Sequence, residues 1–417
     1  MNSSSLRIVV TGLIAQHPFA GGLTWHYLQY VLGLARLGHE VYYVEDSGQW
    51  PYKRAGGVAR RDWIAHDCSH NVDYLAGIMS RFGLADRWAY FFALRPRWFG
   101  LSSKKRAEIL STADLLVNVS GTLRRPQDYR LVPRLAYVDT DPMFTQIKLN
   151  LARGQTKFRR RVDLHDVHFT FGERLAALPA TGHNWHATRQ PVVLSEWDPS
   201  TRRRDVFTTV TNWVSYRPLK HRGRSYAQKD VEFQRFIELP RKVNCTALEI
   251  ASSETKWLEG QRVGRRLRPG GADVPPHLSI EGPSDLFARR GWRVVDAAQV
   301  CADLDGYRDY IQSSKAEWSV AKNGYVVGQP GWFSERSACY LAAGRPVVVQ
   351  DTGFGAVLPV GEGILTFSCL PEAASAIREV RVDYPRHAGA ARAIAEGYFD
   401  SDKVLPRLID QALASHV

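Results

Sequence analysis

The stretch of this 417-residue chain that most constrains its fold runs from Ala316 to Phe354. Ser334 stands where the N-cap of a helix is expected, and Gly344 follows an apolar helix as a left-handed C′ residue would. Pro346 bars further helix, and the run Val347–Val349 is typical of a parallel strand that is covered on both faces. The stretch therefore predicts an αβ unit of a parallel sheet.

The same order of elements predicts an anion site. A glycine-containing turn that enters a helix presents unpaired N–H groups and the positive end of the helix dipole, which suits a phosphate. Lys322 upstream and Arg336 in the first turn would add two cations. The strand then ends in Gln350, Asp351 and Thr352, at the edge where open α/β sheets place ligands.

The segment Gly331–Phe354, with Leu358-Pro359 and the run Gly361–Leu365 after it, resembles the donor half of the GT-B glycosyltransferases. In that superfamily a glutamate-bearing helix ends in A-x-G-x-P-V-V, and a loop at the sugar and a G-x-G-(I/L)-L turn follow. The resemblance implies an α/β fold of GT-B architecture, in which two Rossmann-like domains face each other across a cleft. It also implies a nucleoside-diphosphate sugar as co-substrate, with no cofactor and no catalytic metal.

The resemblance assigns roles to single residues. It implies that Ser334, Arg336 and Lys322 lie at the donor diphosphate. It further implies Glu335 at the ribose and the loop Gln350–Thr352, with Asp351 foremost, at the hydroxyls of the donor sugar.

The sequence departs from the E-x7-E pattern of the best-known retaining members. The second glutamate of that pattern falls on Cys339, the first falls on Gly331, and Glu335 matches neither. The resemblance therefore does not say whether the anomeric configuration is retained or inverted.

The length allows two domains of ordinary size. We expect an N-terminal Rossmann-like acceptor domain at 1–190, a linker at 191–205 and a C-terminal nucleotide-sugar domain at 206–400. The remaining residues, 401–417, are expected to form a helix that packs back on the first domain. A basic, glycine-rich connection is expected at 260–276.

The formal net charge of +13 favours anionic partners: a nucleotide sugar, a nucleic acid or the surface of an anionic membrane. No nucleic-acid-binding signature accompanies the charge, so nucleic acid is the less favoured partner. No run of eighteen apolar residues predicts a transmembrane segment. The five cysteines are scattered, without a C-x-x-C pair, which predicts a reduced, cytoplasmic protein.

The first βαβ unit begins with a strand at Leu6–Gly12 and a loop that contains His17, Gly21 and Gly22. We expect the helix after this loop to start near Thr24. The resemblance places the loop beside the acceptor, and His17 would remove the acceptor proton if the enzyme inverts. Ser120 and Gly121 follow a second buried strand, and we assign them to the acceptor side as well.

Asp139 and Asp141 follow the next strand with D-x-D spacing. Such a pair holds Mn²⁺ or Mg²⁺ in a different class of glycosyltransferase. We favour a catalytic role without metal, in which either carboxylate contacts the acceptor or orients a histidine. A capped turn at the start of a helix is the structural alternative.

Lys220 and Arg222 lie in a basic loop at 215–224, before a helix expected at Ala227–Ile237. This loop follows the first strand of the second domain. The GT-B resemblance brings it to the donor diphosphate, which makes both side chains candidate ligands.

The sequence thus predicts a hexosyltransferase-type glycosyltransferase that acts on a hydroxyl of an unidentified acceptor. Three alternatives stay open. A nucleotide-sugar epimerase of the same fold would use the donor site alone. A basic nucleic-acid-binding or DNA-modifying protein would account for the charge. A scaffold of the same fold would bind no donor.

Overall fold

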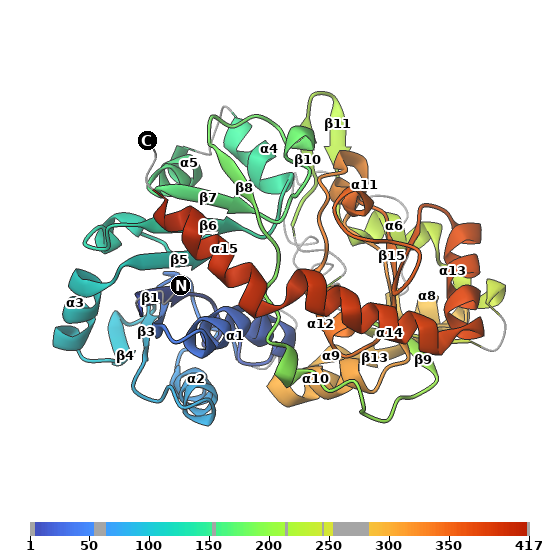
Figure 1. Ribbon diagram of the computed structural model, residues 1–417, viewed down its shortest axis with the longest axis horizontal. Coiled ribbons are helices and arrows are strands. Elements are labelled where there is room, and N and C mark those ends of the chain that lie inside the picture. The colour runs from blue at the N-terminus through green and yellow to red at the C-terminus, as the bar shows by residue number, and fades with distance from the viewer. Residues whose placement is uncertain are drawn as a thin grey trace, which may run out of the picture.

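The computed structural model describes residues 5–53, 64–151, 156–212, 216–243, 246–252 and 283–414. Two sheets stand side by side with helices packed around them (Figure 1). We call the chain up to Ala187 the first half and the chain from Val206 the second half. The connection that we predicted at 260–276 lies outside the described residues.

The first half is built on an eight-stranded sheet with the order β4-β3-β2-β1-β5-β6-β7-β8. All neighbouring pairs are parallel except β3 and β4. The strand order reverses between β1 and β5. The strands are β1 (Arg7–Thr11), β2 (Glu40–Glu45), β3 (Trp88–Phe92), β4 (Arg97–Gly100), β5 (Leu115–Val119), β6 (Leu135–Asp139), β7 (Val167–Thr170) and β8 (Trp185–Ala187).

The helices of the first half vary in how deeply they are buried. The first one, α1 (Gly21–Arg36), is buried from Thr24 to Leu34 without a break, because it lies between the two halves. The others are α2 (Ser69–Arg81), α3 (Ser103–Thr112), α4 (Phe144–Asn150) and α5 (Thr156–Asp163), with the short 3₁₀ turns η2 (Pro126–Tyr129), η3 (Leu175–Ala177) and η4 (Leu194–Glu196).

The second half is built on a six-stranded parallel sheet with the order β13-β12-β9-β14-β15-β16. Its order reverses between β9 and β14. A separate antiparallel hairpin of β10 (Leu219–His221) and β11 (Arg224–Tyr226) follows β9. The sheet strands are β9 (Val206–Thr211), β12 (Ala247–Ser252), β13 (Arg293–Asp296), β14 (Ala316–Ser319), β15 (Val347–Gln350) and β16 (Ile364–Phe367).

Helices cover the second sheet on both sides, and Phe236, Trp318 and Phe367 form part of the apolar cluster on one of them. They are α6 (Lys229–Arg235), α8 (Pro283–Arg289), α9 (Ala297–Val300), α10 (Leu304–Gln312), α11 (Asn323–Gly328), α12 (Glu335–Ala342), α13 (Leu370–Val382), α14 (Tyr384–Ile394) and α15 (Ser401–Leu413), with η5 (Leu239–Lys242), η6 (Phe354–Ala356) and the π-helical η7 (Ala395–Phe399).

The local predictions around α12 are confirmed. The hydroxyl of Ser334 accepts a hydrogen bond from the backbone N–H of Arg336 and caps the helix. Gly344 has a φ of 64°, and β15 follows it as predicted. The prediction of a loop at 215–224 was wrong from Leu219 on, because those residues form the β10–β11 hairpin.

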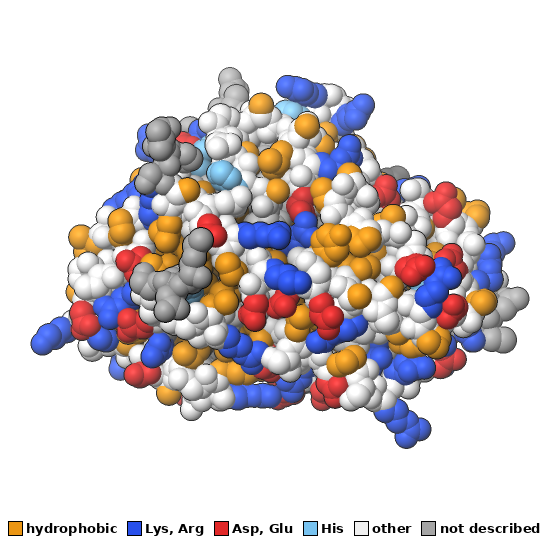
Figure 2. Space-filling view, viewed as in Figure 1, with side chains coloured by type: hydrophobic (Ala, Val, Ile, Leu, Met, Phe, Trp, Pro, Cys, Tyr) orange, Lys and Arg blue, Asp and Glu red, His pale blue; other side chains and the backbone are white. Residues whose placement is uncertain are grey.

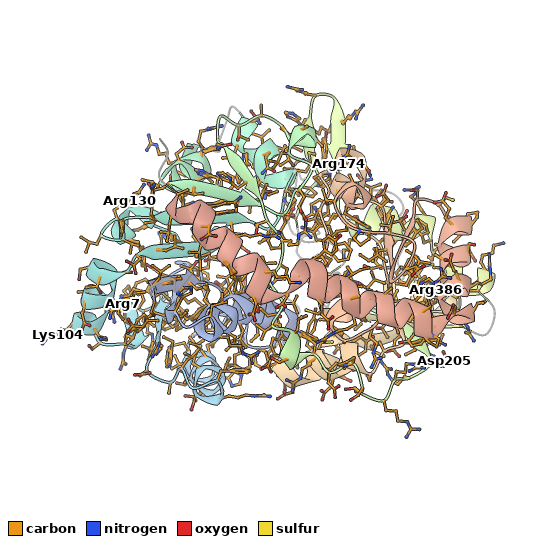
Figure 3. The ribbon with its side chains drawn as sticks, in the orientation of Figure 1. Arg7, Lys104, Arg130, Arg174, Asp205 and Arg386 are labelled. Atoms are coloured by element: carbon orange, nitrogen blue, oxygen red, sulfur yellow. The ribbon has the colours of Figure 1, made fainter. Side chains whose placement is uncertain are left out.

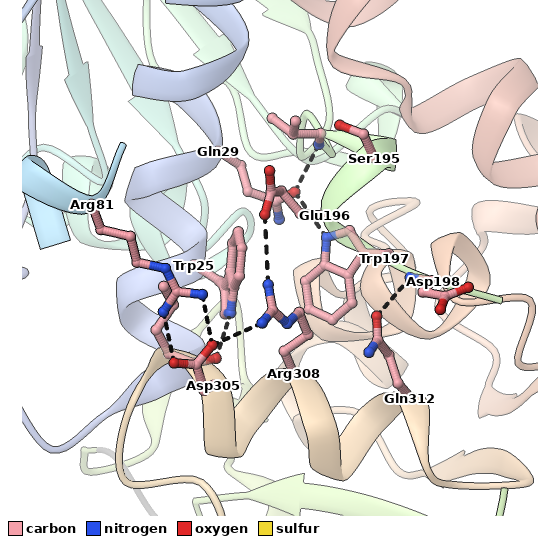
Figure 4. Close-up of polar contacts among 12 residues, drawn as sticks. Trp25, Gln29, Arg81, Ser195, Glu196, Trp197, Asp198, Asp305, Arg308 and Gln312 are labelled. Carbon is pink, nitrogen blue, oxygen red and sulfur yellow. Dashed lines mark hydrogen bonds and ion pairs between the residues drawn. The ribbon is translucent and has the colours of Figure 1, made fainter. Parts of the chain in front are cut away.

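The two halves meet where the linker passes between α1 and α10 (Figure 4). The indole of Trp25 donates to the carbonyl oxygen of Leu304 at 2.8 Å. Arg81 forms an ion pair with Asp305 at 2.6 Å, across the same contact. Because Trp25 is fully buried here, the contact is an extension of the core and not a surface touch.

The chain crosses between the halves a second time near its end. After η7 it returns to the first half, where α15 packs on α1 (Figure 1). The two crossings are hydrogen-bonded to each other: the N–H of Val192 donates to Phe399, and the N–H of Ser401 donates to Val192. Among the described residues, no helix combines the length and the apolar character that a membrane span requires.

Candidate functional site

The second sheet places a buried lysine at the point where its strand order reverses. Lys229 begins α6, is only 8% exposed, and donates to the hydroxyl of Thr211 at 3.2 Å. Within the described ranges no carboxylate lies at ion-pair distance from it. Burial, reinforced by the charge of Arg336, lowers the pKa of Lys229 to about 7. An anion at this crevice would restore its charge.

Arg336 lies in the same crevice but is fully engaged by protein groups. Its guanidinium donates to Glu317 at 2.6 Å, to the carbonyl oxygen of Val210 at 2.7 Å and to Ser319 at 2.7 Å. Glu317 is completely buried. Arg336 therefore neutralises a buried carboxylate, and the expectation that its guanidinium faces a phosphate is corrected.

Glu335 is a half-buried carboxylate at the first position of α12. Its charge acts on Lys229 and Arg336 in the second half and on His26 in α1. No hydrogen-bond partner of its side chain is found in the part of the chain that the structure describes. A half-buried carboxylate without a donor, next to cations, is placed to accept hydrogen bonds from a ligand.

The loop after β15 is ordered by its own polar groups. Asp351 accepts from the backbone N–H of Gly353 at 2.8 Å, and Thr352 donates to the carbonyl oxygen of Trp332 at 2.5 Å. Gln350 donates to Glu232 at 2.6 Å and accepts from the N–H of Ala321 at 3.1 Å. The loop Gln350–Thr352, which we expected at the donor sugar, thus lies beside Ser334. The side chain of Gln350 is used to hold neighbouring residues in place.

At the reversal point of the first sheet, a polar chain runs through α1. The two ring nitrogens of His26 are hydrogen-bonded to Gln190 at 2.7 Å and to Ser120 at 3.2 Å, and Ser120 bonds in turn to Thr140 at 2.9 Å. Ser120 and Gly121 both have positive φ angles, 58° and 60°. A positive φ is costly for serine, so the network holds a strained turn at the carboxyl end of β5.

His17 lies in the loop after β1, away from that network. Buried Glu45 fixes this loop by accepting from the N–H groups of Ala15 and Gln16 at 2.8 and 2.6 Å. The imidazole of His17 stacks on Tyr52, with ring centroids 4.8 Å apart. Burial lowers the pKa of His17 to about 4, so the ring is neutral at pH 7.

Gly21 and Gly22 form the first residues of α1, and the expected helix start at Thr24 is corrected. A Cβ on Gly21 would lie 1.9 Å from the carbonyl oxygen of Asp303, and one on Gly22 would lie 2.7 Å from the ring of Tyr307. These glycines are required because α10 packs directly on the N-terminus of α1. They make a contact between the halves instead of an open ligand loop.

The carboxylate of Asp139 is buried and saturated by groups of its own half. It accepts from Thr145 at 2.7 Å, Gln146 at 2.9 Å and Thr170 at 2.9 Å, and from the N–H of Asp141 at 3.0 Å. Burial raises its pKa. The capped-turn alternative describes Asp139 best, and the expectation that it orients a histidine is corrected.

Asp141 reaches across to the second half. It accepts from Lys322 at 2.8 Å and from the hydroxyls of Tyr216 and Tyr325. Burial opposes its ionisation, but the ammonium of Lys322 lowers the pKa of Asp141 overall. The predicted acceptor-side carboxylate and the predicted diphosphate lysine thus form an ion pair with each other.

Lys220 and Arg222 lie on the β10–β11 hairpin, and among the described residues no hydrogen bond joins either of them to Lys229. Arg222 occupies the turn of the hairpin with a φ of 47°. The hairpin packs between α4 of the first half and α11 of the second. Both side chains are exposed there, and their assignment to the diphosphate stays a prediction.

Sequence reasoning missed Lys229 and the network of His26. Lys229 had one signal: it is the first residue of the first helix after β9, the position that faces the crevice in a Rossmann-like unit. The partners of His26 had none, because a histidine within a buried helix carries no local mark of the residues that it bonds.

Neither a protein-family model nor a curated protein matches this sequence. Solved structures do match over nearly the whole chain. An α-glucosyltransferase in complex with UDP and a 13-mer DNA is 13% identical, with a TM-score of 0.59 over 98% of this chain and 100% of that chain. HepE from Anabaena, in complex with UDP and glucose, is 10% identical, with a TM-score of 0.55 over 97% and 98%.

Sucrose-phosphate synthase from Thermosynechococcus elongatus is 10% identical, with a TM-score of 0.52 over 97% of this chain and 98% of that chain. At such identities the likeness establishes the fold. The chain has the GT-B fold of these glycosyltransferases, with two Rossmann-like sheets and the crossing C-terminal helix. The resemblance seen in the sequence is confirmed at this level.

Proposed function

We propose that the protein is a metal-independent, hexosyltransferase-type glycosyltransferase that moves a sugar from a nucleoside-diphosphate donor to a hydroxyl of its acceptor. Residues 206–400 form the donor domain and residues 1–190 the acceptor domain in this proposal. Support comes from the shared fold and from two relatives in it that hold UDP. The observation that carries the proposal is Lys229, a buried amine without a carboxylate partner in the described chain, at the reversal point of the second sheet.

The reaction forms a bond between the acceptor oxygen and the anomeric carbon, and it breaks the bond from that carbon to the diphosphate. Negative charge develops on the leaving diphosphate, and Lys229 would stabilise it in a site of low dielectric. The N–H groups at the start of α12 would add to this field. Glu335 would accept hydrogen bonds from the ribose, and Asp351 and Thr352 would face the sugar.

The proton of the acceptor hydroxyl needs a base in an inverting reaction. His17 keeps this role in the proposal because its imidazole is neutral at pH 7, as a proton acceptor must be. His26 is the weaker candidate, since both of its ring nitrogens are already hydrogen-bonded.

The first prediction tests Lys229 by a thermal-shift screen with UDP, GDP, TDP and ADP, each with and without Mg²⁺. One nucleotide should raise the melting temperature of the wild type, independently of metal. Lys229→Met should weaken the affinity for that nucleotide by roughly ten- to a hundredfold, the worth of a charged hydrogen bond. The variant should fold at least as stably as the wild type, because it removes a poorly paired buried amine.

Lys315→Met is the matched control. Lys315 pairs with Asp205 beside the opposite, amino end of β14, so its loss should leave the nucleotide response intact. No shift with any of the four nucleotides would refute the donor site. An equal loss in both lysine variants would show that general charge, and not Lys229, holds the nucleotide.

A further inference from the structure

A second pocket lies between the halves, on the side of the β10–β11 hairpin, and encloses about 580 Å³. One wall is the apolar segment 176–180 of the β7–β8 connection, extended by Met143 and by Val327 of α11. The other wall is the hairpin, which contributes His221, Arg222 and Arg224. None of the residues that we assign to the donor crevice lines this pocket, and its volume is ordinary for a small-molecule site.

The charged wall is unbalanced. No Asp or Glu is found among the residues that line the pocket. Arg222 and Arg224 are exposed, and neither has a carboxylate at ion-pair distance in the described part of the chain. Figure 2 shows Lys and Arg side chains gathered over this hairpin, at the top of the molecule. The pocket therefore combines an apolar wall with two unpaired guanidinium groups.

Arg222 also occupies a position that arginine does not favour. The two turn residues, Arg222 and Gly223, have φ angles of 47° and 75°, so both have the left-handed conformation of a tight hairpin turn. Asn, Asp or Gly is preferred there, because a positive φ strains other side chains. No neighbouring atom lies within 4 Å of a Cβ built on Gly223, so the tip of the turn is open. This strained turn holds Arg222 in the lining of the pocket.

The hairpin is anchored at its base, which fixes where the two arginines stand. Tyr226 is 7% exposed and packs with Phe144 and Tyr325, and Leu178 of the apolar wall packs on the same cluster. The backbone N–H of Ala227 donates to the side chain of Asn323 at 3.1 Å. The spacing between the charged and the apolar walls is thus set by packing from both halves, as a preformed site requires.

We propose that this pocket binds the acceptor, and that the acceptor is an amphiphilic anion: a phosphate or carboxylate attached to an apolar body. The anion would lie between Arg222 and Arg224, and the body would lie against Met143, Leu178 and Val327. Guanidinium groups match both oxyanions in geometry. A nucleic-acid strand fits less well, because the lining offers two rings for base stacking, the imidazole of His221 and the buried ring of Tyr226. The role as acceptor site rests on the proposed function.

The test measures binding of octyl phosphate and octanoate by calorimetry at low salt. Inorganic phosphate, octyl glucoside and a 13-nucleotide single-stranded DNA serve as comparison ligands. The wild type should bind at least one of the two octyl anions roughly tenfold more tightly than inorganic phosphate or octyl glucoside. Inorganic phosphate lacks the apolar body, and octyl glucoside lacks the anion. Arg222→Ala/Arg224→Ala should weaken this binding by roughly tenfold or more.

Lys104→Ala/Arg407→Ala is the control of equal charge, because both side chains are exposed and lie outside the pocket. Lys104 lies on α3 at the far end of the first half (Figure 3). This control should bind within about twofold of the wild type, as expected for distant charges that solvent screens. Equal losses in the two double variants would overturn the proposal.

Three other results would also overturn the proposal. The octyl anions could bind no better than inorganic phosphate, or DNA could be the only ligand whose binding depends on the two arginines. The third is that an octyl anion and UDP compete for binding. The nucleotide screen on the same samples separates this proposal from the proposed function. A wild type that binds octyl phosphate but no nucleotide would refute the donor site alone. A nucleotide shift that survives in Arg222→Ala/Arg224→Ala is the expected result.

Discussion

At the scale of single residues, the polar groups of the crevice divide into those that hold the fold and those that are free for a ligand. Arg336 and Glu317 belong to the first kind, since each is nearly or fully buried and they are bonded to each other. Lys229 and Glu335 belong to the second, since neither has an oppositely charged partner at ion-pair distance within the described residues. Substitutions should therefore affect stability at the first pair and ligand binding at the second.

The Arg336–Glu317 pair gives the next prediction. Arg336→Met should cost roughly 3–5 kcal/mol of unfolding free energy, because it leaves the carboxylate of Glu317 buried and uncompensated. Adding Glu317→Gln should recover more than half of this loss, because the buried charge is then gone. Urea unfolding of both variants measures the difference. A stable Arg336→Met protein that loses only its nucleotide response would restore Arg336 as a phosphate ligand.

Residue types at fixed local spacing could be predicted, but pairings across the chain could not. Ser334 and Gly344 were found because caps depend on neighbours within a few residues. Lys322 was expected at a phosphate, yet its partner is Asp141, 181 positions earlier in the chain. Which cation stays free is decided by such long-range pairs, and no sequence window contains both members.

At the scale of elements, α10 and the residue before it pack closely on the N-terminal end of α1. This packing is possible only with glycine at the helix start, because Gly21 lies against the backbone of Asp303 and Gly22 against the ring of Tyr307. The sequence signalled a tight turn with this pair of glycines. The structure instead requires glycine at both positions because Asp303 and Tyr307, almost three hundred residues later in the chain, pack directly against them.

Gly21→Ala should lower the melting temperature by several degrees. The added methyl group would lie 1.9 Å from the carbonyl oxygen of Asp303, so α1 and α10 must separate, at a cost of about 2 kcal/mol. Gly77→Ala in α2 is the matched control, since nothing lies within 4 Å of its Cβ and alanine favours helix by up to about 1 kcal/mol. If both variants melt alike in calorimetry, the close packing of α1 on α10 is not significant for stability.

Elements were predicted best where their apolar pattern is long. The strand after Gly344 and the buried strands of the first half follow from continuous apolar runs. The β10–β11 hairpin was missed because each of its strands has three residues, and four of the six are polar or charged, Leu219 and Tyr226 being the exceptions. Packing against α4 and α11 holds it as a hairpin, and that packing is a tertiary effect.

At the scale of the whole molecule, buried histidines make stability depend on pH. His165 and His168 are 4% and 8% exposed, and burial lowers the pKa of each to about 4. In the unfolded chain a histidine takes up its proton near pH 6.5. The unfolded state therefore binds more protons between pH 6.5 and about 4, and stability is lost as the pH falls through this window.

We expect the free energy of unfolding to fall by roughly 2–3 kcal/mol per buried histidine between pH 6.5 and 4. His168→Gln should reduce this slope, because glutamine can still donate to the carbonyl oxygen of Val162 but does not titrate. His66→Gln, at an exposed position, is the control and should keep the slope of the wild type. Urea midpoints at half-unit pH steps measure all three proteins, and identical slopes for them would contradict the account.

The two-sheet architecture followed from the sequence because both ends of the chain carry regular αβ patterns. The arrangement of the halves did not, because it depends on α10, the linker and α15 all meeting α1. Those contacts bury α1 on almost all sides. Its sequence, rich in Leu, Tyr and Trp, predicts that the helix is buried but not which elements cover it.

The hydrogen bonds that join Val192 to Phe399 and Ser401 have a mechanical consequence. They tie the two chain crossings into one double-stranded hinge instead of two separate tethers. A single tether would let the halves twist about it, whereas a paired one resists torsion and yields chiefly to bending. We therefore expect any motion between the halves to be a bend that keeps Lys229 on one side in register with the strained turn of Ser120 on the other.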